Sequence, residues 1–82
     1  MGYDRHQRAA IRTAAASVVR QLTELTGTEP RVTAEREAVR IETDVTDTAL
    51  MQWTRLLAVL ELGAEYGVIR TSGGQIAWLR IA

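Results

Sequence analysis

The chain is a small, cysteine-free protein whose charges balance. Its 82 residues are enough for one domain with a modest core, a size at which association with a second chain often adds stability. The ten basic residues, all of them arginine, are balanced by ten acidic residues. The chain therefore lacks the strong positive charge typical of a general nucleic-acid binder. The absence of cysteine excludes disulfides, thiol chemistry and cysteine-based metal sites.

Apolar residues are spread along the chain rather than gathered in one run. No apolar stretch approaches the roughly 18 residues of a membrane span, and the polar, basic start lacks the apolar core of a signal peptide. We therefore expect a cytoplasmic protein with no membrane association.

The spacing of apolar residues predicts a first helix over residues 4–26, ended by Gly27 in the C′ position. Beside its apolar stripe runs a basic edge, which suits either a solvated face or contacts with phosphate or an acidic partner. The apolar stripe is Ile11, Ala14, Ala15, Val18, Leu22 and Leu25, and the basic edge is Arg5, Arg8, Arg12 and Arg20.

Residues 31–44 predict a β-hairpin. The alternation of apolar residues changes phase in the middle of this stretch, and a two-residue turn at Arg36-Glu37 restores it. A bulge or a longer loop stays open as an alternative, because Arg-Glu is unusual in such a turn. The pairs expected from the two-residue turn are Val32–Ile41, Ala34–Val39 and Arg31–Glu42.

Residues 46–66 predict one long amphipathic helix, capped by Thr46 and ended at Gly67. It carries two apolar stripes on opposite sides, so it needs two partners. The first stripe is Trp53, Leu56, Leu57, Leu60 and Ala64, and the second is Met51, Ala58 and Leu62, with Val59 and Tyr66 to one flank.

Residues 68–81 predict a second hairpin around a turn at residues 72–75, where two glycines can take positive φ. Apolar residues lie on both of its faces, and only one face can pack on the helices. The expected pairs are Val68–Leu79, Ile69–Trp78 and Thr71–Ile76. We expect the face of Val68, Ala77, Leu79 and Ile81 to be core and the face of Ile69, Ile76, Trp78 and Arg80 to point outward.

These elements predict a single α+β domain over residues 1–82. The order is αββαββ, with a four-stranded antiparallel sheet and two helices packed on one face. A winged helix is the alternative, since a long helix followed by a hairpin with two glycines resembles a recognition helix and wing. That fold requires three short helices before its wing, and only two long ones are predicted.

Residues that commonly carry catalysis are few and scattered. The lone histidine, His6, has no second histidine or cysteine to join it in a metal site. Glu61 and Glu65 lie one turn apart on the polar side of the second predicted helix, where solubility explains them better than acid–base chemistry. Gly73-Gly74 joins two strands and opens no helix, so it is not a phosphate loop. We predict no catalytic site, no cofactor and no metal.

The first function that fits is a non-catalytic protein-interaction module that works as a homodimer, or with another protein partner, through the second helix. The alternative for this surface is that the first helix wraps far enough to cover it. The predicted interface residues are Met51, Arg55, Ala58, Val59, Leu62 and Tyr66.

The second function, from a different class, is nucleic-acid binding by phosphate contacts and stacking on tryptophan. It requires Arg5, Arg12 and Arg80 to lie on one continuous surface. The predicted contact residues are Arg5, Arg8, Arg12, Arg20, Trp78 and Arg80.

Overall fold

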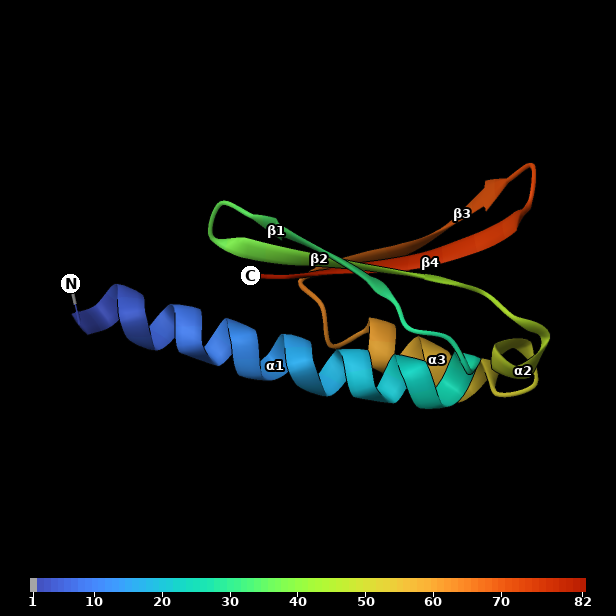
Figure 1. The fold of residues 1–82 in the computed structure, drawn as a ribbon, viewed down its shortest axis with the longest axis horizontal. Helices are drawn as coiled ribbons and strands as arrows, with labels where there is room; N and C mark the ends of the chain where they lie inside the picture. The colour runs from blue at the N-terminus through green and yellow to red at the C-terminus, as the bar shows by residue number, and fades with distance from the viewer. Residues whose placement is uncertain (1) are drawn as a thin grey trace.

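The computed structural model describes residues 2–82, with side chains from residue 7 onward. Its four strands form one antiparallel sheet in the order β1-β2-β4-β3, and the helices lie on one face of it (Figure 1). The predicted αββαββ order is confirmed, and the winged-helix alternative is wrong because both hairpins join a single sheet. The elements are α1 (Gly2–Thr26), β1 (Arg31–Glu35), β2 (Ala38–Asp44), α2 (Asp47–Leu50), α3 (Trp53–Leu60), β3 (Glu65–Thr71) and β4 (Gly74–Ile81).

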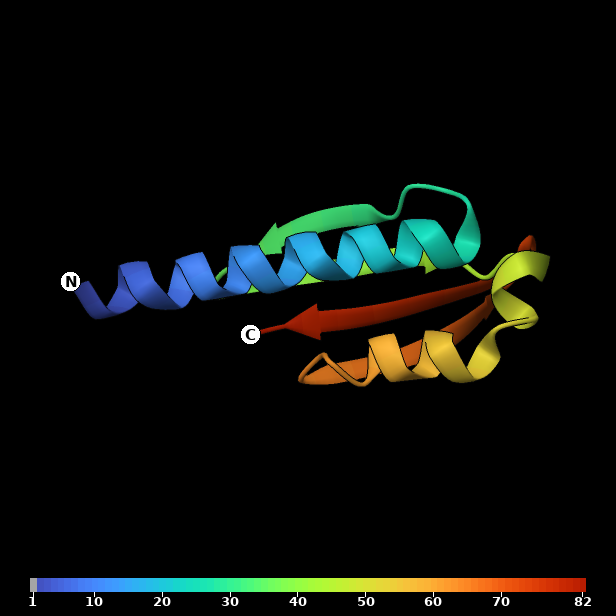
Figure 2. The same ribbon diagram turned by 90° about the horizontal axis from the view of Figure 1, so that it is seen from below.

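The helical layer covers the two central strands best. The long helix α1 packs mainly on β2, while α3 packs on β4 and beside α1. Figure 2 shows the two helices side by side, with α3 on the side of the layer where β3 lies. Both outer strands therefore receive little cover from the helices.

The core lies between the helices and the facing side of the sheet. The apolar stripe of α1 is buried as predicted, except that Ala14 is exposed and Ile11 is only half-buried. A stripe at positions 15, 18, 22 and 25 turns Ala14 to the solvent side of the helix. The core residues are Ala15, Val18, Leu22, Leu25, Ile41, Ala49, Leu56, Val59, Leu60, Ala77, Leu79 and Ile81.

The first hairpin has the predicted register. Val32 pairs with Ile41, Ala34 with Val39 and Arg31 with Glu42, and the turn is the two residues Arg36 and Glu37. Glu37 takes a φ of 65°, so a residue with a side chain occupies the left-handed region that favours glycine.

The second hairpin has a different register from the one predicted. Val68 pairs with Ala77, Ile69 with Ile76 and Thr71 with Gly74, a shift of two residues, because the turn is Ser72-Gly73 rather than residues 72–75. A shift of two keeps every side chain on its face of the sheet. The predicted directions of the two faces are therefore confirmed, but Val68, predicted as core, is 39% exposed because it lies in an outer strand.

The predicted helix over residues 46–66 is wrong in its continuity and its end. It is broken between α2 and α3 at Met51 and Gln52, and it ends at Leu60. Thr46 caps α2 as predicted, because its hydroxyl oxygen accepts a hydrogen bond from the N–H of Ala49 at 3.2 Å.

One glycine is required where the chain turns from α3 toward β3. At Gly63 a Cβ would lie 2.9 Å from the Cβ of Leu79 and 3.1 Å from the carbonyl oxygen of Arg80, so the chain turns where only glycine fits. Gly67, predicted as the helix stop, lies instead within β3 opposite Trp78. Residues 65 and 66 consequently belong to β3 and not to a helix.

Candidate protein-interaction surface

Exposed apolar side chains concentrate in one stretch of the chain. Of eight large apolar side chains that are exposed among the described residues, seven lie between residues 50 and 69, and Val32 is the eighth. Met51 is 87% exposed and Leu62 is 62% exposed. Exposed apolar groups in such number favour an interaction surface. The seven are Leu50, Met51, Trp53, Leu62, Tyr66, Val68 and Ile69.

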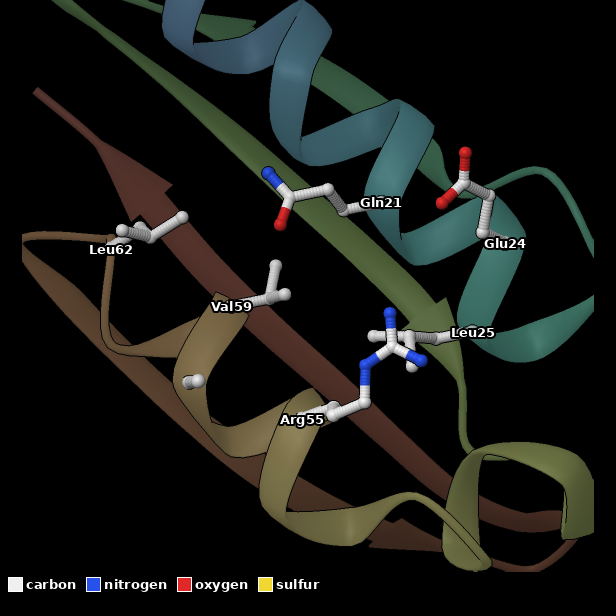
Figure 3. Close-up of a pocket in the computed structure, with 7 residues that line it drawn as sticks. Gln21, Glu24, Leu25, Arg55, Val59 and Leu62 are labelled. Carbon is white, nitrogen blue, oxygen red and sulfur yellow. The ribbon is translucent and has the colours of Figure 1, made fainter.

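A shallow groove of about 330 Å³ lies between α1 and α3 (Figure 3). Its base includes Leu25 of α1 and Val59 of α3, both of which are buried. Glu24 stands on the α1 side and Arg55 on the α3 side, so the two rims carry opposite charges. The remaining lining residues are Gln21, Ala58 and Leu62.

The predicted interface residues do not form one surface. Val59 is only 6% exposed and belongs to the core, so α1 covers part of the stripe, as the alternative interpretation held. Met51 lies in the break between α2 and α3, and Tyr66 lies in β3. The residues of the set that line the groove are Arg55, Ala58, Val59 and Leu62.

The edge strand β3 is the second exposed apolar region. Tyr66 and Val68 lie on the helix side of the sheet, since their partners in β4 are the buried Leu79 and Ala77, and Ile69 lies on the other side. Each of these three β3 side chains is at least 39% exposed. Sequence reasoning predicted Ile69 to point outward but missed Val68 as a surface residue. The signal was the apolar character of both hairpin faces, but it did not identify the outer strand.

Trp78 lies on the face of the sheet opposite the helices, as predicted. It is half-buried, while its neighbours Ala77 and Leu79 are in the core. The guanidinium carbon of Arg40 lies 4.3 Å from the centroid of the Trp78 ring, a cation–π contact that covers one side of the indole.

Every arginine on this outer face has a carboxylate partner. Three arginines against four carboxylates leave the face with one net negative charge, which does not attract phosphate. The ion pairs are Arg80–Glu35 at 3.0 Å, Arg80–Glu65 at 3.3 Å, Arg31–Asp44 at 3.4 Å and Arg40–Glu42 at 3.7 Å.

The basic edge of α1 and the outer face meet at an acidic residue. Arg8 and Arg12 line a hollow under the first hairpin together with Glu35, and the same Glu35 carboxylate binds Arg80. Arg20 is exposed further along α1. Arg5 lies before the side chains that the structure describes. Among the described side chains, carboxylates thus lie between the arginines of the predicted nucleic-acid surface.

The described residues offer no cluster of metal ligands and no membrane-spanning helix. Among them, no three or more His, Asp or Glu side chains gather closely enough to hold a metal ion. No helix within residues 2–82 is both long and apolar enough to cross a membrane.

The chain was compared with models of protein families, with curated proteins and with solved structures, and none of these comparisons found a match.

Proposed function

We propose that the protein is a non-catalytic protein-interaction module that works as a homodimer. The observation that carries the proposal is the set of seven exposed large apolar side chains between residues 50 and 69. Removing apolar surface from water contributes roughly 25 cal/mol for each Å², so covering several of these side chains adds several kcal/mol. A small domain gains proportionally more from such cover than a large one.

A second copy of the chain is the simplest cover. A two-fold axis buries the same patch on both protomers, so one set of exposed side chains serves as both halves of the interface. The net charge of zero also means that two copies do not repel each other strongly. A second copy can bind at either of two regions of this surface: the groove between α1 and α3, or the edge of β3.

Sedimentation equilibrium over the micromolar range tests the proposal. We expect a reversible monomer–dimer equilibrium, with the apparent mass rising from 9.1 kDa toward twice that value as concentration increases. Arg20→Ala, on the exposed side of α1, is the control and should leave the equilibrium unchanged. A wild-type chain that stays monomeric up to about 1 mM, roughly a 4 kcal/mol limit on its association, contradicts the proposal.

A further inference from the structure

Two hydrogen bonds determine which way the backbone groups of β4 point. The carbonyl of Gln75 accepts from the N–H of Val45 at 2.9 Å, on the β2 side. The carbonyl of Arg80 accepts from the N–H of Ala64 at 2.8 Å, on the β3 side. Backbone groups alternate between the two sides of a strand. The even-numbered residues of β4 therefore bond toward β3.

The open edge of β3 consequently carries three residues with outward backbone groups. The register pairs the even-numbered residues of β4 with the odd-numbered residues of β3, whose N–H and C=O groups are thereby used. Tyr66, Val68 and Arg70 direct theirs away from the sheet. An exposed edge of this length, with apolar side chains and no proline, is a template for another strand.

We propose that this edge pairs antiparallel with β3 of a second copy, in a register centred on Val68. The proposal rests on the homodimer proposed above and names the surface that forms it. In this register all seven residues of β3 are paired, and Tyr66, Val68 and Arg70 all direct their backbone groups to the partner strand. The result is one continuous eight-stranded sheet.

The side chains of β3 are complementary to themselves in this register. Val68 faces Val68 of the partner subunit on the two-fold axis, which buries two half-exposed apolar groups. Tyr66 faces the partner's Arg70, a pair suited to cation–π contact. Ile69 faces the partner's Gly67 on the other side of the sheet. The indole of Trp78 lies over Gly67, with its Nε1 2.9 Å from the place a Cβ would take, so Ile69 would contact an aromatic ring there.

The charges of β3 favour the antiparallel direction. Glu65 begins the strand and Arg70 lies near its end. Glu65 lies on the outer face, where it binds Arg80, and Arg70 lies on the helix side, so the two do not meet across the interface. Antiparallel pairing nevertheless keeps like charges at opposite ends, whereas in-register parallel pairing would place Arg70 beside Arg70 and Glu65 beside Glu65. This distribution selects a two-fold dimer.

The position of α3 adds to the interface. Because α3 lies on the β3 side of the helical layer (Figure 2), two copies joined at β3 bring their α3 helices to the same side of the joined sheet and toward each other. Trp53 at the start of α3 is 39% exposed and adds apolar surface beyond the strand. Contacts at both this edge and the groove between α1 and α3 would link copies into an open chain, so a closed dimer uses one of them.

The test exploits the position of Val68 on the two-fold axis, where it faces its own copy. Val68→Lys and Val68→Glu are each expected to weaken dimerisation at least tenfold in sedimentation equilibrium, because like charges oppose each other across the axis. An equimolar mixture of the two variants should recover association as a heterodimer. Val32→Lys is the matched control: Val32 is 53% exposed on the same side of the other edge strand, and its change should have no effect.

Other outcomes separate the failure of this inference from the failure of the homodimer. If Leu62→Glu in the groove abolishes association while both Val68 variants dimerise normally, the inference is overturned and the homodimer stands. If the two variants fail to recover when mixed, the register centred on Val68 is wrong. If the wild type is monomeric, both proposals fall. Should Val68→Lys lower the melting temperature, Arg70→Glu, an exposed change, supplies a second test: it removes the cation that faces the partner's Tyr66 and should weaken dimerisation, and unchanged dimerisation would contradict the register.

Discussion

The two edge strands of the sheet belong to similar hairpins but present different edges. The first edge strand, β1, follows Pro30. Its backbone groups alternate between the β2 side and the open edge, so only those of Val32 and Ala34 point outward. Two of its five residues are charged, and the turn that follows adds Arg36 and Glu37. In β3 three residues face outward, and two of its seven residues are charged. Short length, proline and charge protect an edge against strand addition. The edge of β1 has all three features. The edge of β3 is longer, has no proline and carries a smaller share of charged residues.

The difference teaches that topology alone does not decide whether a sheet associates. Both hairpins have two-residue turns and supply one central strand each. Their central strands are equally buried, whereas their outer strands differ in length, charge and apolar exposure. The second hairpin is therefore the half of the sheet with an unused surface.

The largest expected losses of stability lie in the two central strands of the sheet, where the two hairpins should behave alike. Ile41 and Leu79 lie directly opposite each other, and both are fully buried. Ile41→Ala and Leu79→Ala should each lower the free energy of unfolding by about 2–5 kcal/mol, and the two losses should agree within about 1 kcal/mol. Urea titration at a fixed protein concentration measures both. A loss below about 1 kcal/mol for either variant would show that the two central strands are not equivalent.

A smaller effect is expected on the outer face. Trp78 is larger than its neighbour Leu79, but it is half-buried and covered on one side by Arg40. Trp78→Ala should therefore lower the free energy of unfolding by about 1–2 kcal/mol, less than Leu79→Ala. Thermal and urea melts of the two variants give the comparison. A cost for Trp78→Ala above that of Leu79→Ala would place Trp78 in the core.

The smallest effect concerns the turns. Glu37 holds a φ of 65° in the first hairpin, a conformation that costs a residue with a side chain about 1 kcal/mol. Glu37→Gly should raise the free energy of unfolding by about 0.5 kcal/mol after the entropy lost by glycine is subtracted. Gly73→Ala is the control in the other turn, where a Cβ meets no atom within 4 Å. A destabilised Glu37→Gly variant would indicate that the Glu37 side chain stabilises its turn.

The sequence predicted the first hairpin fully and the second only in part, for a physical reason. The change of phase between Ala34 and Val39 favoured a two-residue turn at Arg36-Glu37 over a bulge or longer loop, and the register followed from that turn. The second turn contains two glycines, which permit either a two-residue or a four-residue loop. The faces were still correct, because the two registers differ by an even number of residues.

The candidate surface was less predictable than the fold. A helical stripe does not reveal where a helix breaks, and the close approach of Leu79 to Gly63 depends on tertiary packing. Val59 was assigned to the surface although it packs under α1. The outward backbone groups of β3 depend on the strand order, which local patterns do not determine.

Concentration-dependent hydrogen exchange tests the central claim most directly, because it compares the amides of the two edges in one experiment. The amides of Tyr66, Val68 and Arg70 should exchange rapidly in the dilute monomer, and so should those of Val32 and Ala34. Their protection should rise with concentration across the dimerisation range, while the Val32 and Ala34 amides stay fast at every concentration. Association that leaves the three β3 amides unprotected would contradict pairing at this edge.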